Sequence, residues 1–227
     1  MIGLETWFNN FTHFFWSSQT KESVADIPLP AVEYAIWWTM KCSEAAAFVG
    51  GILVHPAYRY YLIKKLTPET TTNNSRKIIR NTCRRLQGRF LLAALASGPV
   101  LSLAYTNAKG WTEKDVRDRC YQIRINSDAL VLDRLSTVGF FIGWYWKRFQ
   151  GGVDGINLGI GYFAFYASIL KPYTNPLLKD KLTQEDLYGS PTQAKQDETS
   201  LQRFWRSVGY SPSPESAIDM GTAQSSS

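Results

Sequence analysis

Four ionisable side chains lie within or beside the apolar stretches of this chain: Lys41, Glu44, Asp133 and Asp154. Ionisable groups inside apolar helices often mark ion or proton paths. Lys41 and Glu44 are three residues apart and can instead pair on one helix face, and Asp133 can pair with its neighbour Arg134. Local neutralisation is the interpretation we favour. A polar path lined by Lys41, Glu44 and Asp133 remains the alternative.

No catalytic set accompanies these side chains. The sequence contains no GxSxG, HExxH or P-loop pattern, and Gly155, Gly159 and Gly161 lack the GxGxxG order of a dinucleotide loop. Its three cysteines form no CxxC pair and its two histidines lie far apart, so a metal site is not expected. The sequence leaves open whether Cys42 and Cys120 form a disulfide. We expect a protein that is not an enzyme and has no catalytic cofactor.

Glycines at four-residue spacing form the most informative pattern in the chain. Gly151, Gly155 and Gly159 would share one helix face, where each glycine costs about 1 kcal/mol relative to alanine in water. In a bilayer, glycine lets a second helix approach closely. Asp154 would lie near the start of this helix, where a carboxylate is favoured. The predicted helix-packing residues are Gly50, Gly51, Gly98, Gly139, Gly143, Gly151, Gly155 and Gly159.

The apolar residues are concentrated in four blocks, although the hydrophobic content of 44% and the mean hydropathy of −0.22 are ordinary for a soluble protein. The blocks cover about residues 31–63, 86–105, 130–146 and 151–170. Each is near the length that crosses a bilayer, and the last two are close enough to form an antiparallel hairpin. We predict an all-α integral membrane four-helix bundle with short tilted spans over residues 31–171.

Two extensions and one charged loop accompany the predicted bundle. Residues 1–30 place aromatic side chains, from Trp7 to Phe15, at helical spacing. This amphipathic helix either lies at a membrane interface or on a partner, or packs on the protein's own core. The segment 106–129 alternates acidic and basic residues, which predicts a solvated surface helix. Residues 172–227 form a polar C-terminal extension.

The net charge is +6, and most of the excess lies between residues 64 and 89. No aromatic stacking residues or zinc motif accompany it, so a nucleic-acid partner is not expected. A basic loop beside a membrane span suits anionic phospholipid such as cardiolipin. The positive-inside rule places this loop and the last hairpin turn on the matrix or cytosolic side, with both termini opposite. The predicted lipid-contacting residues are Lys64, Lys65, Arg76, Lys77, Arg80, Arg84, Arg85, Arg89, Lys147 and Arg148.

This organisation resembles a known family: the four-span presequence translocase subunits of the mitochondrial inner membrane and the related supernumerary membrane-arm subunit of respiratory complex I. Small-residue stripes in every span, the basic loop after the first span and the glycine-rich last hairpin carry the resemblance. Residues 157–171, NLGIGYFAFYASILK, look like the final span of the complex I subunit. The resemblance implies a noncatalytic helix bundle with both termini in the intermembrane space.

The function expected from this resemblance is that of an accessory subunit. It would stabilise the membrane arm of a mitochondrial inner-membrane respiratory complex, foremost complex I (NADH:ubiquinone oxidoreductase). Its partners would be other subunits of the complex and anionic phospholipids, with no small-molecule substrate. The alternatives are a protein translocase or channel component of the same membrane and a supernumerary subunit of mitochondrial ATP synthase.

Overall fold

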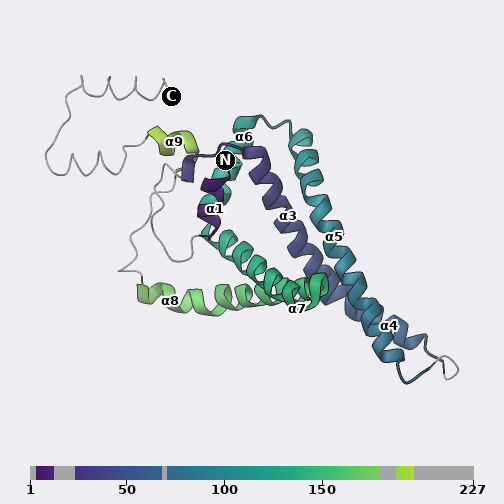
Figure 1. The fold of residues 1–227 in the computed structure, drawn as a ribbon. Helices are drawn as coiled ribbons and strands as arrows, with labels where there is room; N and C mark the ends of the chain where they lie inside the picture. The colour runs from purple at the N-terminus through teal and green to yellow at the C-terminus, as the bar shows by residue number, and fades with distance from the viewer. Residues whose placement is uncertain (1–3, 13–23, 68–70, 179–187, 197–227) are drawn as a thin grey trace, which may run out of the picture.

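The protein is helical throughout the residues that its computed structural model describes. These are residues 4–12, 24–67, 71–178 and 188–196. Within them, helices are joined by short turns and no β-strand occurs (Figure 1). The prediction of an all-α fold is therefore confirmed for this part of the chain. Parts of both predicted extensions, including Phe14 and Phe15, lie outside the described residues.

The first long helix runs without a break through three sections: α3 (Pro30–Phe48), the π-helix η1 (Val49–Val54) and α4 (His55–Lys64). Pro30 suits the first turn, where the backbone N–H would have no helical partner. The wider π-helical turns come directly before Pro56. In a regular helix the proline ring would clash with the carbonyl group four residues earlier. We attribute the local widening to the relief of this clash.

The second long helix, α5 (Ser75–Lys109), packs along α3 and α4 in the opposite direction (Figure 1). It continues through Pro99 and ends at Gly110, whose φ of 61° is the left-handed conformation common after a helix. The prediction of a basic loop was wrong for most of its length. The connection between α4 and α5 is confined to residues 65–74, and the basic residues from 76 to 89 form the first turns of α5. Lysine and arginine are good helix formers, and α4 supplies a packing surface.

The short helix α6 (Glu113–Ile125) crosses the ends of α3 and α5 (Figure 1). A capping box starts it: Asp115 N–H donates to Thr112 Oγ1, and Thr112 N–H donates to the Asp115 carboxylate. Cys120 and Tyr121, on its inner face, are buried. The predicted solvated helix therefore lies here, but one of its faces belongs to the core.

The third long element, α7 (Ser127–Phe165), is a hairpin of two helical arms. Its first arm begins where the Asn126 side chain accepts a hydrogen bond from the Ala129 N–H. The chain reverses at Lys147 and Arg148, which have non-helical backbone angles. Arg148 has φ 56° and ψ −144°, a conformation that is rare for residues other than glycine.

The remaining helices extend the bundle at its ends. The second arm of α7 continues into the π-helix η2 (Tyr166–Leu170) and α8 (Lys171–Leu178), again with a proline, Pro172, following the π-helical turns. The short helices α1 (Glu5–Thr12) and α9 (Pro191–Gln196) lie at the α6 end of the molecule (Figure 1).

Two hydrophobic clusters hold these elements together. The first gathers the segment before α3 with α3, α6 and α9; its buried members are Ala25, Ile27, Tyr34, Val116, Cys120, Tyr121 and Ala194. The second joins α3, α5 and the second arm of α7; its buried members are Ala47, Leu91, Val153 and Ile156. The first cluster lies at the end of the bundle where α1, α6 and α9 meet the start of α3, and we call this region the cap. The second cluster holds the interior of the bundle together.

Two helical stretches are long and apolar enough to cross a membrane by length and composition: residues 75–109 and residues 127–174. The second includes both arms of the α7 hairpin, of which the first covers residues 127–146. The helix over residues 30–64, expected as the first span, does not meet this criterion among the described residues. It carries Glu33, Lys41 and Glu44, which lower its hydropathy.

Candidate functional site

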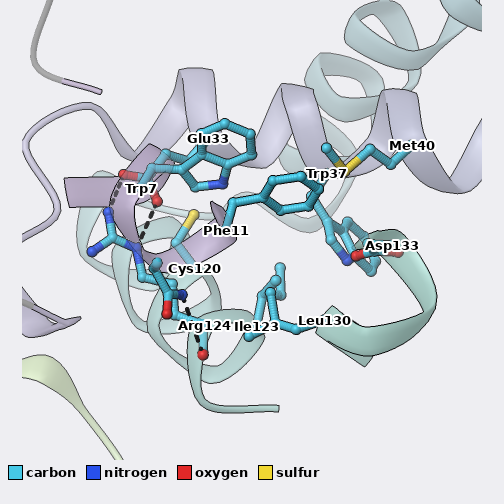
Figure 2. A pocket seen from close by; sticks show the side chains of 11 residues that line it. Trp7, Phe11, Glu33, Trp37, Met40, Cys120, Ile123, Arg124, Leu130 and Asp133 are labelled. Carbon is cyan, nitrogen blue, oxygen red and sulfur yellow. Dashed lines mark hydrogen bonds and ion pairs between the residues drawn. The ribbon is translucent and has the colours of Figure 1, made fainter. Parts of the chain in front are cut away.

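The most extensively bonded side chain in the cap is Arg124 of α6. It is 4% exposed, and it forms a two-pronged ion pair with Glu33 of α3, with distances of 3.0 Å from Nε to Oε2 and 2.5 Å from Nη2 to Oε1 (Figure 2). Its Nη1 also donates to the carbonyl oxygens of Val24 and Asp26, each at 3.0 Å. A buried charge is tolerated when it is paired and its remaining donors are satisfied. Arg124 meets both conditions and joins α6, α3 and the segment before α3.

Two arginines attach the N-terminal helix α1 to this cap. Arg124 Nη2 donates to Thr6 Oγ1 at 3.2 Å, and Arg134 of α7 donates to the carbonyl oxygens of Phe11 at 2.8 Å and Asn10 at 2.5 Å. Trp7 and Phe11 stack with 5.2 Å between ring centroids and face the same small pocket (Figure 2). The aromatic helix was expected either at a membrane interface or partner, or on the protein's own core. The described part of it, α1, packs on the core.

The pocket beneath α1 is too small for a substrate. Its volume is about 20 Å³, which is the space of a single water molecule. Cys120 lines it, and its thiol donates to the Pro30 carbonyl oxygen at 3.3 Å. Burial raises the pKa of this thiol to about 12, so it stays protonated and is a poor nucleophile at neutral pH. The geometry stabilises the cap and offers no reactive group there.

A second charged cluster lies between α3 and the first arm of α7. Lys41 pairs with Glu44 at 3.0 Å and with Asp133, which is 92 positions away in the sequence. Asp133 is 2% exposed and Glu44 7%. The structure therefore brings together the three residues proposed for a polar path. The expected pairing of Asp133 with Arg134 was wrong, since Arg134 turns to the carbonyl groups of α1 and Lys41 takes its place.

This cluster borders a hollow of about 130 Å³ between α3, α5 and α7. Its walls are mostly apolar, and two buried polar atoms on it, Glu44 Oε1 and Ser136 Oγ, make no hydrogen bond within the described part of the chain. Hollows of this size hold small apolar molecules or a few waters. Buried polar atoms without a partner are costly, so water or a polar group is the occupant that such atoms favour.

Glycine makes the α7 hairpin possible. Methyl groups added at Gly139, Gly143, Gly151 and Gly155 would each overlap a backbone carbonyl group of the opposite arm. At Gly159 the added carbon would lie 2.7 Å from the Leu135 carbonyl oxygen. Gly139 therefore faces Gly155 and Gly143 faces Gly151, while Gly159 faces the backbone of Leu135. The missing side chains let the two arms of the hairpin touch.

The other predicted packing glycines lie where α3 and η1 meet their neighbours. A methyl group at Gly98 of α5 would overlap the Thr39 backbone, and one at Gly51 would overlap the Asn157 side chain. Asn157 Nδ2 donates to the Ala47 carbonyl oxygen at 2.9 Å, close to where α3 passes into η1. Gly50 has more room, with the Phe90 side chain 3.5 Å from an added carbon.

The predicted lipid-contacting residues lie at the end of the molecule opposite the cap or at the α7 turn. Arg84 is half-buried and the other nine are exposed; the set is Lys64, Lys65, Arg76, Lys77, Arg80, Arg84, Arg85, Arg89, Lys147 and Arg148. Lys65 lies over the Tyr61 ring at 4.6 Å, and Arg148 over the Trp144 ring at 5.7 Å. The surface of α4 and the start of α5 is therefore strongly basic.

The structure also decides two other points that the sequence raised: the role of Asp154 and the state of the cysteines. Asp154 does not cap the second arm of α7: it is exposed, in the second turn after the reversal at Arg148, beyond the free N–H groups of the first turn. The three cysteines are free, so Cys42 and Cys120 form no disulfide. Within the described residues, no three His, Cys, Asp or Glu side chains gather as metal ligands do.

The buried pair of Glu33 and Arg124 was not predicted. Its only signal in the sequence was an acidic residue near the start of an apolar block and a later basic residue in a charged helix. Many such pairs can be drawn, because 91 positions separate the two residues. Only the fold of α6 across α3 selects this one.

The comparison with protein families gives a match over most of the chain. The family described as "Protein of unknown function (DUF1757)" matches residues 7–166, which is most of the chain, and the chain belongs to this family. The matched region includes most of α1, together with α3 to α6 and the α7 hairpin, and therefore both charged clusters. The comparison with curated proteins gave no match.

Proposed function

We propose that this member of the DUF1757 family is a noncatalytic integral membrane subunit that stabilises a larger complex. The assembly we favour is a respiratory complex of the mitochondrial inner membrane, foremost complex I. In this proposal the protein packs against neighbouring subunits and phospholipid through its outer surface. It acts by shape and packing, without a substrate.

The observation that carries the proposal is the apolar outer surface of α5 and α7. Val100 is 65% exposed, Leu103 62% and Leu158 75%. Other large apolar side chains on these elements are also exposed: Leu92, Leu101, Phe141, Ile142, Tyr145, Trp146, Tyr162 and Phe165. A soluble monomer rarely exposes a contiguous apolar surface of this kind. Lipid or the apolar surface of another subunit would cover it at no cost.

Four transmembrane segments remain our proposal, with boundaries adjusted to the fold. The turn of α7 lies level with the middle of α5, because Gly88 faces Phe149 there. If Lys147 and Arg148 mark one membrane surface, the spans are residues 30–54, about 88–109, 127–146 and 149–170. Each is long enough for a hydrocarbon core of about 30 Å. α4 and the first turns of α5 then project beyond the membrane.

The orientation follows from the distribution of charge. The basic surface of α4 and α5 would face the matrix, where positively charged segments are retained. The cap formed by α1, α6 and α9 would face the intermembrane space, which places both termini there. Anionic phospholipids such as cardiolipin would bind beside the basic surface.

Membrane extraction and native gels test this function. We expect the protein to stay in the membrane fraction after carbonate treatment, and to co-migrate with one respiratory complex on native gels. Its depletion should lower the level of that complex and leave the others unchanged. Release of the protein by carbonate would contradict the membrane proposal. Co-migration with ATP synthase would move the subunit to that assembly.

A translocase or channel component is the second candidate, and one observation favours it. Lys41, Glu44 and Asp133 meet beside a hollow that carries unpartnered polar atoms, which is the chemistry of a polar path. Depletion separates the two candidates. Rapid loss of precursor import, with respiratory complexes still intact, would favour translocation. Early loss of a single respiratory complex would favour the structural role.

A further inference from the structure

A groove of about 570 Å³ lies where α6 crosses α3 and α5, and one of its walls is aromatic. Five rings from these helices and the following turn line it: Tyr34, Trp37, Trp38, Tyr105 and Trp111. The Tyr105 ring lies 5.6 Å from Trp38 and 5.3 Å from Trp111 between centroids, inclined at 48° and 85°. Tyr105 therefore stands at a large angle to both neighbours, whereas Tyr34 and Trp37 are stacked at 11°. The rings pack into an aromatic wall, against which a quaternary ammonium group can lie.

The opposite wall comes from α6 and is charged. Asp115, Asp118, Arg119 and Gln122 line it. Asp115 is engaged in the helix cap, and Arg119 donates to Gln122 at 3.0 Å. Asp118 is half-buried, and its side chain makes no hydrogen bond or ion pair with the described residues. The groove thus offers aromatic rings and a free carboxylate to a cation, with a guanidinium group nearby for an anion.

We propose that this groove binds the phosphocholine head group of a membrane phospholipid. The trimethylammonium group would lie against the aromatic wall near Asp118, and the phosphate would approach Arg119. A quaternary ammonium has no N–H to donate, so ring faces and a carboxylate at van der Waals distance suit it better than hydrogen-bond acceptors do. Arginine is well suited to phosphate recognition.

The position of the groove favours a lipid over a soluble choline compound. It lies at the cap end of α3 and α5, where Trp and Tyr side chains are enriched in membrane proteins at the head-group level. One helical turn before Tyr105, Leu101 is exposed on the same face of α5, so acyl chains can continue from the groove along an apolar surface. This inference rests on the proposed membrane function. It adds a zwitterionic lipid site at the end opposite the basic surface.

Lipid binding to the purified full-length protein tests the inference. In dodecyl maltoside, native mass spectrometry would compare dioleoyl lipids with choline, ethanolamine and glycerol head groups. We expect the choline lipid to bind about tenfold more tightly than the glycerol lipid at this site, in line with a desolvated cation–π interaction. Equal binding of the three lipids would overturn the proposal.

Two matched substitutions on α6 locate the site. Asp118→Asn removes the free carboxylate, and we expect it to weaken choline lipid binding about tenfold. Glu113→Gln makes the same chemical change on an exposed residue outside the groove and should leave binding unchanged. Circular dichroism would establish that both variants keep their helix content. Equal affinities in the two variants would place the lipid elsewhere and refute the site.

The lipid-binding result can be distinguished from the result of the carbonate extraction that tests the proposed function. Release by carbonate together with retained selectivity for the choline lipid in detergent would refute membrane integration and support the groove. Resistance to carbonate without selectivity for choline would refute the groove alone. A Trp111→Leu variant adds a second test, because it removes a ring and leaves the charges in place. Its choline selectivity should fall, and unchanged selectivity would contradict binding at the aromatic wall.

Discussion

At the scale of single residues, the cap depends on charges that are buried together. Arg124 and Glu33 are each almost inaccessible, and Arg124 contacts three separate segments of the chain. A buried ion pair adds little stability over an apolar pair of the same shape. Loss of one partner is costly, however, because the other charge stays buried. The pair therefore specifies how α6 sits on α3 more than it stabilises the fold.

Glu33→Gln should destabilise the protein by about 3–5 kcal/mol, because it leaves the Arg124 charge buried without its counterion. Glu113→Gln breaks the exposed pair with Arg117 and should cost no more than about 1 kcal/mol. Thermal unfolding in detergent, followed by tryptophan fluorescence, measures both. Similar melting temperatures for the two variants would show that the buried pair does not control the cap.

Cys120 provides a prediction on pH dependence. Since burial raises its pKa to about 12, the thiol should resist maleimide labelling at pH 7 in the folded protein and react after denaturation. A raised pKa means that the folded protein holds this proton more tightly. The stabilisation is complete below the usual thiol pKa of 9.0 and is lost as the pH rises toward 12. Fast labelling of Cys120 in the native state would contradict its buried position.

At the scale of elements, glycine and proline set the shape of the long helices. Prolines follow both π-helical segments, and glycines occupy the positions where the arms of α7 touch. The turn between the arms places Arg148 in a conformation that favours glycine. A basic side chain there suits the lipid head groups that we propose at this level.

Gly155→Leu should open the α7 hairpin, because the added side chain would overlap the Gly139 carbonyl group. Gly161→Leu is the matched control on the same arm, since nothing lies within 4 Å of a carbon added there. Native gels would measure the assembled complex in cells carrying each variant. We expect a large loss for Gly155→Leu only. Normal assembly with Gly155→Leu would count against hairpin packing as the basis of function.

At the scale of the whole molecule, the two ends differ in charge and in chemistry. α4 lies at one end of the molecule, and α1, α6 and α9 lie at the other (Figure 1). The α4 end, with the start of α5, carries the basic surface, and the α6 end carries the aromatic groove. A protein built in this way can contact anionic phospholipid on one side of a membrane and choline phospholipid on the other. The proposed spans lie between these two surfaces.

The basic end should retain cardiolipin. Replacing Arg76 and Lys77 by glutamine removes two exposed positive charges, each worth about 1 kcal/mol toward anionic lipid. We therefore expect cardiolipin affinity to fall about thirtyfold. The control replaces Lys109 and Lys114, which lie at the cap end, with the same residue. Lipid analysis after detergent washing compares the pairs, and equal retention would exclude a specific role of the basic end.

Much of the fold could be predicted from local patterns. The spacing of apolar residues indicated the helices, the glycine repeats indicated close helix packing, and the short gap near Lys147 indicated a reversal of the chain. These signals are readable because each depends on residues within a few turns of one another. The boundaries were less accurate, because the basic residues of α5 were expected in a loop although they are compatible with a helix.

The sequence alone determined the helical class of this protein and the glycine faces on which its helices can touch, since both follow from local periodicity and residue size. Only the tertiary structure decided which charges meet: Lys41 with Asp133, Arg124 with Glu33, and the arginine beside Asp133 with α1. The same holds for the aromatic groove, whose walls come from three elements. A charge or a ring finds its partner through the fold, and distance along the chain does not reveal it.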